Sequence, residues 1–108
     1  LQELDAKTAY LKEGLDAVLK ASGIPYTINH LGSMISLHFA EHQVVDFETA
    51  AATDTAMFNQ YFHQMLKRGV YLPPSAFESW FLNNALTYED LDETIVKTAQ
   101  SLTEMTMV

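Results

Sequence analysis

The residues best suited to chemistry lie in one short stretch, from Gly69 to Glu78, which reads GVYLPPSAFE. Pro73 and Pro74 fix φ and remove two backbone donors, so this stretch cannot be helical and is poor material for a strand. The stiff bend that they make is expected to hold Glu78 at a fixed place. Most Glu side chains are simply exposed. The alternative that we favour is a carboxylate held at the edge of a cleft.

A second pattern runs from His38 to His42 and matches the H-x-x-E-H string of an inverted zinc-protease motif. That chemistry needs both histidines on one helical face, with Glu41 beside them as the base. His38 instead ends an alternating run typical of a strand, and no third ligand is signalled downstream. We therefore expect a strand end followed by a polar turn, without a metal.

The remaining candidates are isolated. His30 and His63 have no carboxylate cluster near them in the sequence, and Ser75 has no histidine placed to activate it as a nucleophile. The 4 glycines are scattered singly, so no phosphate-gripping loop is present. On its own, the chain shows no complete catalytic apparatus.

The elements that must position these residues follow from hydrophobic periodicity and turn signals. The predicted order is α-β-β-α-β-β-α, in a single α+β domain of residues 1–108 with a mainly antiparallel sheet covered by helices in two layers. The predicted elements are a helix at 1–22, strands at 26–30 and 34–39, one helical turn within 46–52, a helix at 53–68, extended pieces at 70–72 and 77–82, and a last helix capped by Thr87.

Three details of the helices can be checked. The first helix has an apolar stripe, and its charged side chains are expected in water: Lys7, Lys12, Glu13, Asp16 and Lys20. The last helix begins with a capping-box-like pair, Thr87 and Asp90. The helix at 53–68 has a broad apolar face, read as core or, as a minority alternative, as a partner surface: Met57, Phe58, Tyr61, Phe62, Met65 and Leu66.

Composition excludes several classes of protein. The 108 residues suit one domain, and 48% hydrophobic content suits a globular core. A net charge of −8 argues against nucleic-acid binding, which needs a basic surface. The absence of cysteine excludes disulfides and thiolate zinc sites, and no apolar run approaches a membrane span of about 20 residues. Because the chain begins with Leu1 rather than Met, we expect a processed or excised piece of something longer.

The stretch from Gly69 to Glu78, followed by Phe81, closely resembles the C-terminal domain of the glutamate-1-semialdehyde 2,1-aminomutase family, which often shows G-V-Y-L-[AP]-P-S-[AQ]-F-E-x-x-F. Further matches lie upstream and downstream: Gly32-Ser33-Met34, Phe39, Asp46, Asp54, Phe58, Phe62, Met65, Leu66, Thr87, Glu89-Asp90 and Asp92. The chain departs from the family at Trp80, where a small residue is common, and at Leu86, where the family usually has histidine.

The resemblance implies a small domain of the aspartate-aminotransferase fold, class III, from a cytoplasmic, homodimeric pyridoxal-phosphate enzyme. That family converts glutamate 1-semialdehyde to 5-aminolevulinate on the way to porphyrins. Its cofactor lysine lies in a preceding large domain, so the implied partners are that domain and a small-molecule substrate, without nucleic acid or membrane. Glu78 and Ser75 are then the substrate-facing residues. None of this chain's lysines matches the Schiff-base motif, so the piece is expected to be inactive and cofactor-free alone.

Two other interpretations stay open. The chain could be the small domain of a related ω-aminotransferase, which is disfavoured because such enzymes usually carry Arg near Glu78 to clamp a substrate carboxylate. It could also be a stand-alone α+β module that binds a partner through the 58–66 face.

Overall fold

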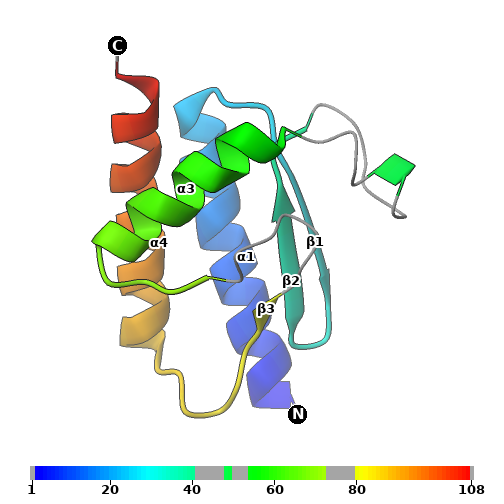
Figure 1. The fold of residues 1–108 in the computed structure, drawn as a ribbon. Coiled ribbons are helices and arrows are strands. Elements are labelled where there is room, and N and C mark those ends of the chain that lie inside the picture. The colour runs from blue at the N-terminus through cyan, green and yellow to red at the C-terminus, as the bar shows by residue number, and fades with distance from the viewer. Residues whose placement is uncertain (1, 41–47, 50–53, 73–79, 108) are drawn as a thin grey trace.

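The computed structural model describes residues 2–40, 48–49, 54–72 and 80–107 (Figure 1). Their α+β class confirms the prediction. The elements are α1 (Gln2–Ser22), β1 (Thr27–Leu31), β2 (Met34–His38), α3 (Thr55–Lys67), β3 (Trp80–Phe81) and α4 (Tyr88–Thr106). Residues 48–49 are also helical.

The sheet of the described residues has the order β1-β2-β3, and both pairings are antiparallel, as expected. Leu31 and Met34 pair across a two-residue turn in which Gly32 has a φ of 58°, the left-handed region that glycine tolerates. Ile35 and Leu37 of β2 are 1% and 4% exposed, so they form the sheet's share of the core.

Helices α1 and α4 lie side by side and run in the same direction, although most of the chain separates them (Figure 1). They approach closely at Gly14, where an added Cβ would lie 2.2 Å from Cδ1 and 2.8 Å from Cγ1 of Ile95. α1 also contacts β1 and β2, so it joins the sheet to the helical layer. A side chain at residue 14 would therefore force Ile95 to move where the two helices meet.

Helix α3 packs on α4 through a buried polar contact. The hydroxyls of Tyr61 and Thr98 lie 2.9 Å apart, and the Ser101 hydroxyl donates to Sδ of Met65 at 3.3 Å. Tyr61, Met65, Thr98 and Ser101 are all 0% exposed. Burying these groups is acceptable because they satisfy one another.

The helix ends occur where the sequence signals predicted them, within one or two residues. Asp54 caps α3, with Oδ1 accepting from the Met57 N–H at 2.9 Å. Gly69, past the end of α3, has a φ of 84°. Thr87 and Asp90 form a complete capping box at the start of α4.

Two predictions about described residues are wrong. Residues 70–72 are not a strand, because the Val70 N–H donates back to the Met65 carbonyl at the end of α3. Lys7 is not on the water-facing side: it is 5% exposed, pairs with Glu3 at 3.5 Å, and its ammonium lies 5.9 Å from the centre of the Tyr88 ring. The start of α4 covers it, and that neighbour is remote in the sequence.

Candidate functional site

Ser75 and Glu78, the predicted substrate-facing residues, lie outside the described residues. The structure does describe the residues on either side of their segment. On the N-terminal side, the Gly69 N–H donates to the Leu66 carbonyl at 2.9 Å, which closes the end of α3. Leu72 is then 3% exposed and belongs to the core. The residue that precedes 73–79 is therefore fixed in the core.

The C-terminal side is held by the sheet. In β3, Trp80 and Phe81 pair with Ile35 and Met34 of β2. The Leu82 N–H donates to the Ser33 carbonyl at 2.9 Å. Both flanks of the segment that carries Glu78 are thus fixed to different parts of one core.

A pocket of about 320 Å³ lies beside the N-terminal flank, between that flank and α4. It is lined by Gly69, Val70, Tyr71, Leu86, Asp90, Glu93, Thr94 and Lys97. Its charged groups already have protein partners: Asp90 Oδ2 accepts from the Thr87 N–H at 2.8 Å, and Lys97 donates to Glu93. Hydrogen bonds from Thr87 lower the pKa of Asp90. Leu86, which departs from the usual histidine of the family that the sequence resembles, is partly buried against the core.

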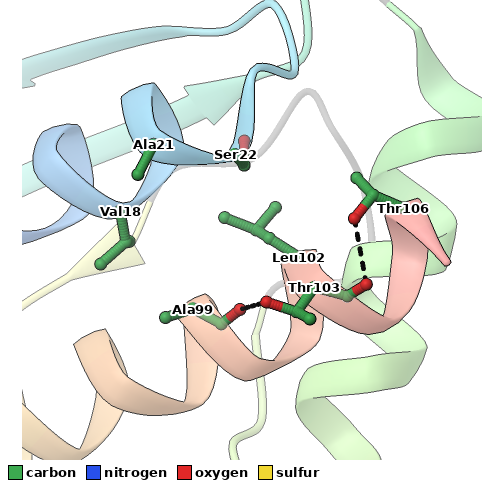
Figure 2. Close-up of a pocket in the computed structure, with 7 residues that line it drawn as sticks. All are labelled: Val18, Ala21, Ser22, Ala99, Leu102, Thr103 and Thr106. Atoms are coloured by element: carbon green, nitrogen blue, oxygen red, sulfur yellow. Dashed lines mark hydrogen bonds between the residues drawn. The ribbon is translucent and has the colours of Figure 1, made fainter.

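A second pocket, of about 260 Å³, lies between the C-terminal ends of α1 and α4 (Figure 2). Its lining has no ionisable side chain: Val18, Ala21, Ser22, Ala99, Leu102, Thr103 and Thr106. The Thr103 and Thr106 hydroxyls donate to the backbone carbonyls of Ala99 and Thr103, each at 3.0 Å. The pocket offers apolar contact and hydroxyl acceptors, without acid–base chemistry.

A third hollow, of about 330 Å³, lies between α1 and α4 and is lined by Tyr10, Glu13, Gly14, Asp92 and Ile95. The Tyr10 hydroxyl donates to Asp92, and this bond raises the pKa of Tyr10. Tyr10 also packs edge-on against Tyr88, with ring centres 5.1 Å apart. These contacts tie α4 to α1 and leave the tyrosine a poor proton donor near neutral pH.

The lysines of this chain do not fit a pyridoxal-phosphate site. Four of them form ion pairs with nearby carboxylates: Lys7 with Glu3, Lys12 with Asp16, Lys67 with Glu104 and Lys97 with Glu93. Lys20 is exposed in the last turn of α1, where a cation suits the helix dipole. Of these lysines, Lys97 lines the pocket beside residues 69–71, but Asp90 and Glu93 line it too, so that pocket does not suit a phosphate.

The histidine candidates do not converge either. His38 ends β2 and is 5% exposed, whereas Glu41 and His42 lie outside the described residues. His30 is exposed on β1, and His63 is exposed beside the Phe62 ring. Within the described ranges, no group of three or more His, Cys, Asp or Glu side chains could hold a metal ion. In the same ranges, no helix has the length and apolarity needed to cross a bilayer.

The apolar face of α3 is divided. Phe58, Tyr61 and Met65 are buried, as the core interpretation expects, and Met57 and Phe62 pack partly against the core. Leu66 is 45% exposed. The greater part of this face is therefore core.

Sequence reasoning missed Glu104, whose carboxylate holds the end of α3 at the point where the Gly69 segment begins. Its Oε1 accepts from Lys67 at 2.9 Å and its Oε2 from Arg68 at 2.5 Å. In the sequence, Lys67 and Arg68 are simply adjacent cations at the end of the helix predicted at 53–68. A partner 36 residues away leaves no local signal.

Comparison with known proteins gives a consistent set of relatives. No family model matches the chain. It is 56% identical over 92 residues to a glutamate-1-semialdehyde 2,1-aminomutase of Flavobacterium johnsoniae, covering 85% of this chain and 22% of that protein. An aminomutase of the same name from Thermus thermophilus is 46% identical over 95 residues, covering 88% of this chain and 22% of that protein. The chain thus spans about a fifth of the length of the curated relatives it matches.

Solved structures show the same fold. A glutamate-1-semialdehyde aminomutase of Pseudomonas aeruginosa PAO1 matches with a TM-score of 0.84 at 20% identity, covering 96% of this chain and 23% of that chain. A β-phenylalanine aminotransferase of Variovorax paradoxus matches with a TM-score of 0.83 at 22% identity, covering 94% of this chain and 23% of that one. The fold is therefore that of a segment shared by these aminotransferases.

Proposed function

This chain belongs, over the segment that it spans, to the glutamate-1-semialdehyde 2,1-aminomutase family, and we propose that it acts as the single C-terminal small domain of such an enzyme. The observation that carries the proposal is the 56% identity over 92 residues to a curated aminomutase. An aminomutase is also among the solved structures that share the fold.

The proposed reaction is the isomerisation of glutamate 1-semialdehyde to 5-aminolevulinate. The amino group moves to the neighbouring aldehyde carbon, and the carbon that it leaves becomes a ketone, so substrate and product have the same atoms. Pyridoxal phosphate would supply the chemistry that lets an amino group change carbons. Since none of this chain's lysines matches the Schiff-base motif, the cofactor lysine would lie in the rest of the polypeptide, and the chain alone should be inactive.

The part assigned to this chain is to form one wall of the substrate cleft. Glu78 and Ser75 would face the substrate there, and support comes from the described flanks, which are fixed at Leu72 in the core and at β3 in the sheet. A segment that is fixed at both ends can hold a side chain in one orientation toward the substrate.

Glu78 would set the choice of substrate. Glutamate has a carboxylate where glutamate 1-semialdehyde has an aldehyde, and two like unit charges about 4 Å apart repel by about 4 kcal/mol at a surface-like dielectric, before further screening. A protein carboxylate close to that position therefore disfavours external glutamate, and it meets no such charge on the aldehyde. An Arg in this place would do the opposite.

The first experiment uses the full-length protein that contains this chain, purified with pyridoxal phosphate. It should form 5-aminolevulinate from glutamate 1-semialdehyde without an external amine. A requirement for an external amino donor would identify the related ω-aminotransferase instead. If the protein shows neither activity, the proposal is wrong, and the interpretation as a stand-alone interaction module remains.

The second experiment replaces Glu78 by Gln in that protein. Removing the negative charge should raise the rate of transamination from glutamate, measured as 2-oxoglutarate, relative to 5-aminolevulinate formation. Glu78→Asp, which keeps the charge, is the control. An unchanged ratio in an active Glu78→Gln enzyme contradicts the assigned role.

The remaining expectations belong to the same proposal. The enzyme would serve porphyrin biosynthesis in the cytoplasm as a homodimer, with the large domain and a small-molecule substrate as the partners of this chain. The net charge of −8 supports the expectation that nucleic acid is not a partner. Fractionation and sedimentation of the full-length protein would test location and assembly.

A further inference from the structure

Three apolar side chains at the end of α3 form one patch that is open to water. Tyr71 is 75% exposed and Leu66 is 45% exposed. Phe62 connects them, because it precedes Leu66 by about one helical turn and its ring centre lies 6.1 Å from that of Tyr71. These three residues are called the Tyr71 patch below.

The patch differs from the other large apolar side chains that are exposed among the described residues. Tyr10 and Tyr88 already pack on each other. Leu31 lies at the β1–β2 turn, Val96 lies in the middle of α4, and Met107 caps the end of that helix. Contiguous exposed apolar side chains mark surfaces that bind another protein or domain, whereas scattered ones are ordinary.

The outward position of Tyr71 is set by its two neighbours in the chain. On one side, the Val70 N–H donates to the Met65 carbonyl at 2.9 Å. On the other side, Leu72 is 3% exposed and belongs to the core. The Tyr71 ring also packs edge-on against Phe62. The fold therefore holds this ring at the surface, next to an apolar neighbour.

The rest of a longer polypeptide fits the patch better than a second copy of this chain. The chain is only 22% of the length of its aminomutase relative from Flavobacterium johnsoniae, so most of such a protein lies outside it. Two copies of this chain, each with a net charge of −8, repel each other. Ser75, which the proposed function places at the substrate, follows Tyr71 by four residues, so their Cα atoms are at most about 14 Å apart. The domain that holds the other side of the substrate must therefore approach the patch as well.

We propose that the Tyr71 patch is a surface through which this domain packs on an apolar surface of the large domain of the same polypeptide. This inference rests on the proposed function, because it takes the chain as one domain of a longer enzyme. It adds three residues that serve the contact between domains and have no part in the chemistry.

The test replaces Tyr71 by the photoreactive amino acid p-benzoylphenylalanine in the full-length protein, which is then irradiated. A cross-link should form from position 71 to a peptide outside residues 1–108, in a product of monomer mass. The same replacement at Val96, which is 54% exposed on α4, is the control and should give no such cross-link. The inference is wrong if position 71 gives no cross-link, links only within residues 1–108, or gives a product of dimer mass.

A second measurement tests whether the contact is apolar. With the photoreactive residue at Leu66, Tyr71→Glu should abolish the cross-link, because it would bury a charge in the contact. Tyr71→Phe keeps the ring and should retain the cross-link. Equal yields in the two variants would contradict an apolar contact. A full-length protein that forms the cross-link but has no aminomutase activity would instead refute the proposed function and leave this contact in place.

Discussion

Gly14 decides how closely two helices can pack. Gly14→Ala should destabilise the fold by about 1–3 kcal/mol through the overlap with Ile95, less the roughly 1 kcal/mol that Ala gains in helix propensity. Urea unfolding would measure the change. Combining it with Ile95→Val, which removes the nearest methyl group, should give a smaller loss than the sum of the two single changes. A more stable Gly14→Ala chain would contradict the close approach.

Tyr61 places a hydroxyl in the core. Tyr61→Phe should cost about 1 kcal/mol, because it removes the hydrogen bond to Thr98. Burial raises the pKa of Tyr61 above its ordinary value of 10.0, so its contribution to stability is complete below that pH and is lost as the pH rises beyond it. The variant should therefore lose stability less steeply in alkali. Tyr71→Phe, at a residue that is 75% exposed, is the control and should change neither property.

At the scale of elements, α4 depends on its capping box. Thr87→Ala should destabilise the fold by about 1 kcal/mol, because the side chain accepts from the Asp90 N–H at 3.1 Å. Thr103→Ala, at an exposed position inside the same helix, should cost little, and thermal unfolding would compare the two. Equal losses would mean that the cap contributes nothing specific.

Helix ends could be read from the sequence because their signals are local. Asp54, Gly69 and Thr87 each act on neighbours a few residues away; the helix predicted at 53–68 is found at Thr55–Lys67, and the predicted Thr87 cap is confirmed. The two failures have different causes. Lys7 is covered by Tyr88, which is remote in the sequence, whereas the Val70 N–H bonds locally, to the Met65 carbonyl, instead of in the sheet.

The candidate site could be predicted only in part from the sequence, because some of its contacts join residues that are far apart in the chain. The Gly69–Glu78 motif is contiguous, so its family resemblance was visible, and the relatives confirm it. The Glu104 cluster joins residues 36 and 37 positions apart, which no spacing rule predicts. The roles of Ser75 and Glu78 stay predictions, because both lie outside the described residues.

At the scale of the whole molecule, acid should weaken the fold through two carboxylates. The pKa values of Asp90 and Glu104 lie below their ordinary values of 3.8 and 4.5. Depressed values mean that the stability these groups give is complete above the ordinary values and is lost as the pH falls through the native ones. Unfolding measured between neutral pH and about pH 3 should show this loss, and Asp90→Asn with Glu104→Gln should make the decline shallower. An unchanged slope would contradict these assignments.

The pairing of α1 with α4 determines when the core of this domain can form during translation. Leu11 and Leu15, which are 3% and 0% exposed in the finished fold, belong to a helix whose partner ends at Thr106. Until that partner has emerged, the apolar stripe of the nascent α1 lacks a surface that it needs, and chaperones would find it accessible. Contacts between the first and last parts of a chain form slowly, because closing a long loop costs conformational entropy. This domain therefore completes its core only when translation has passed its last helix.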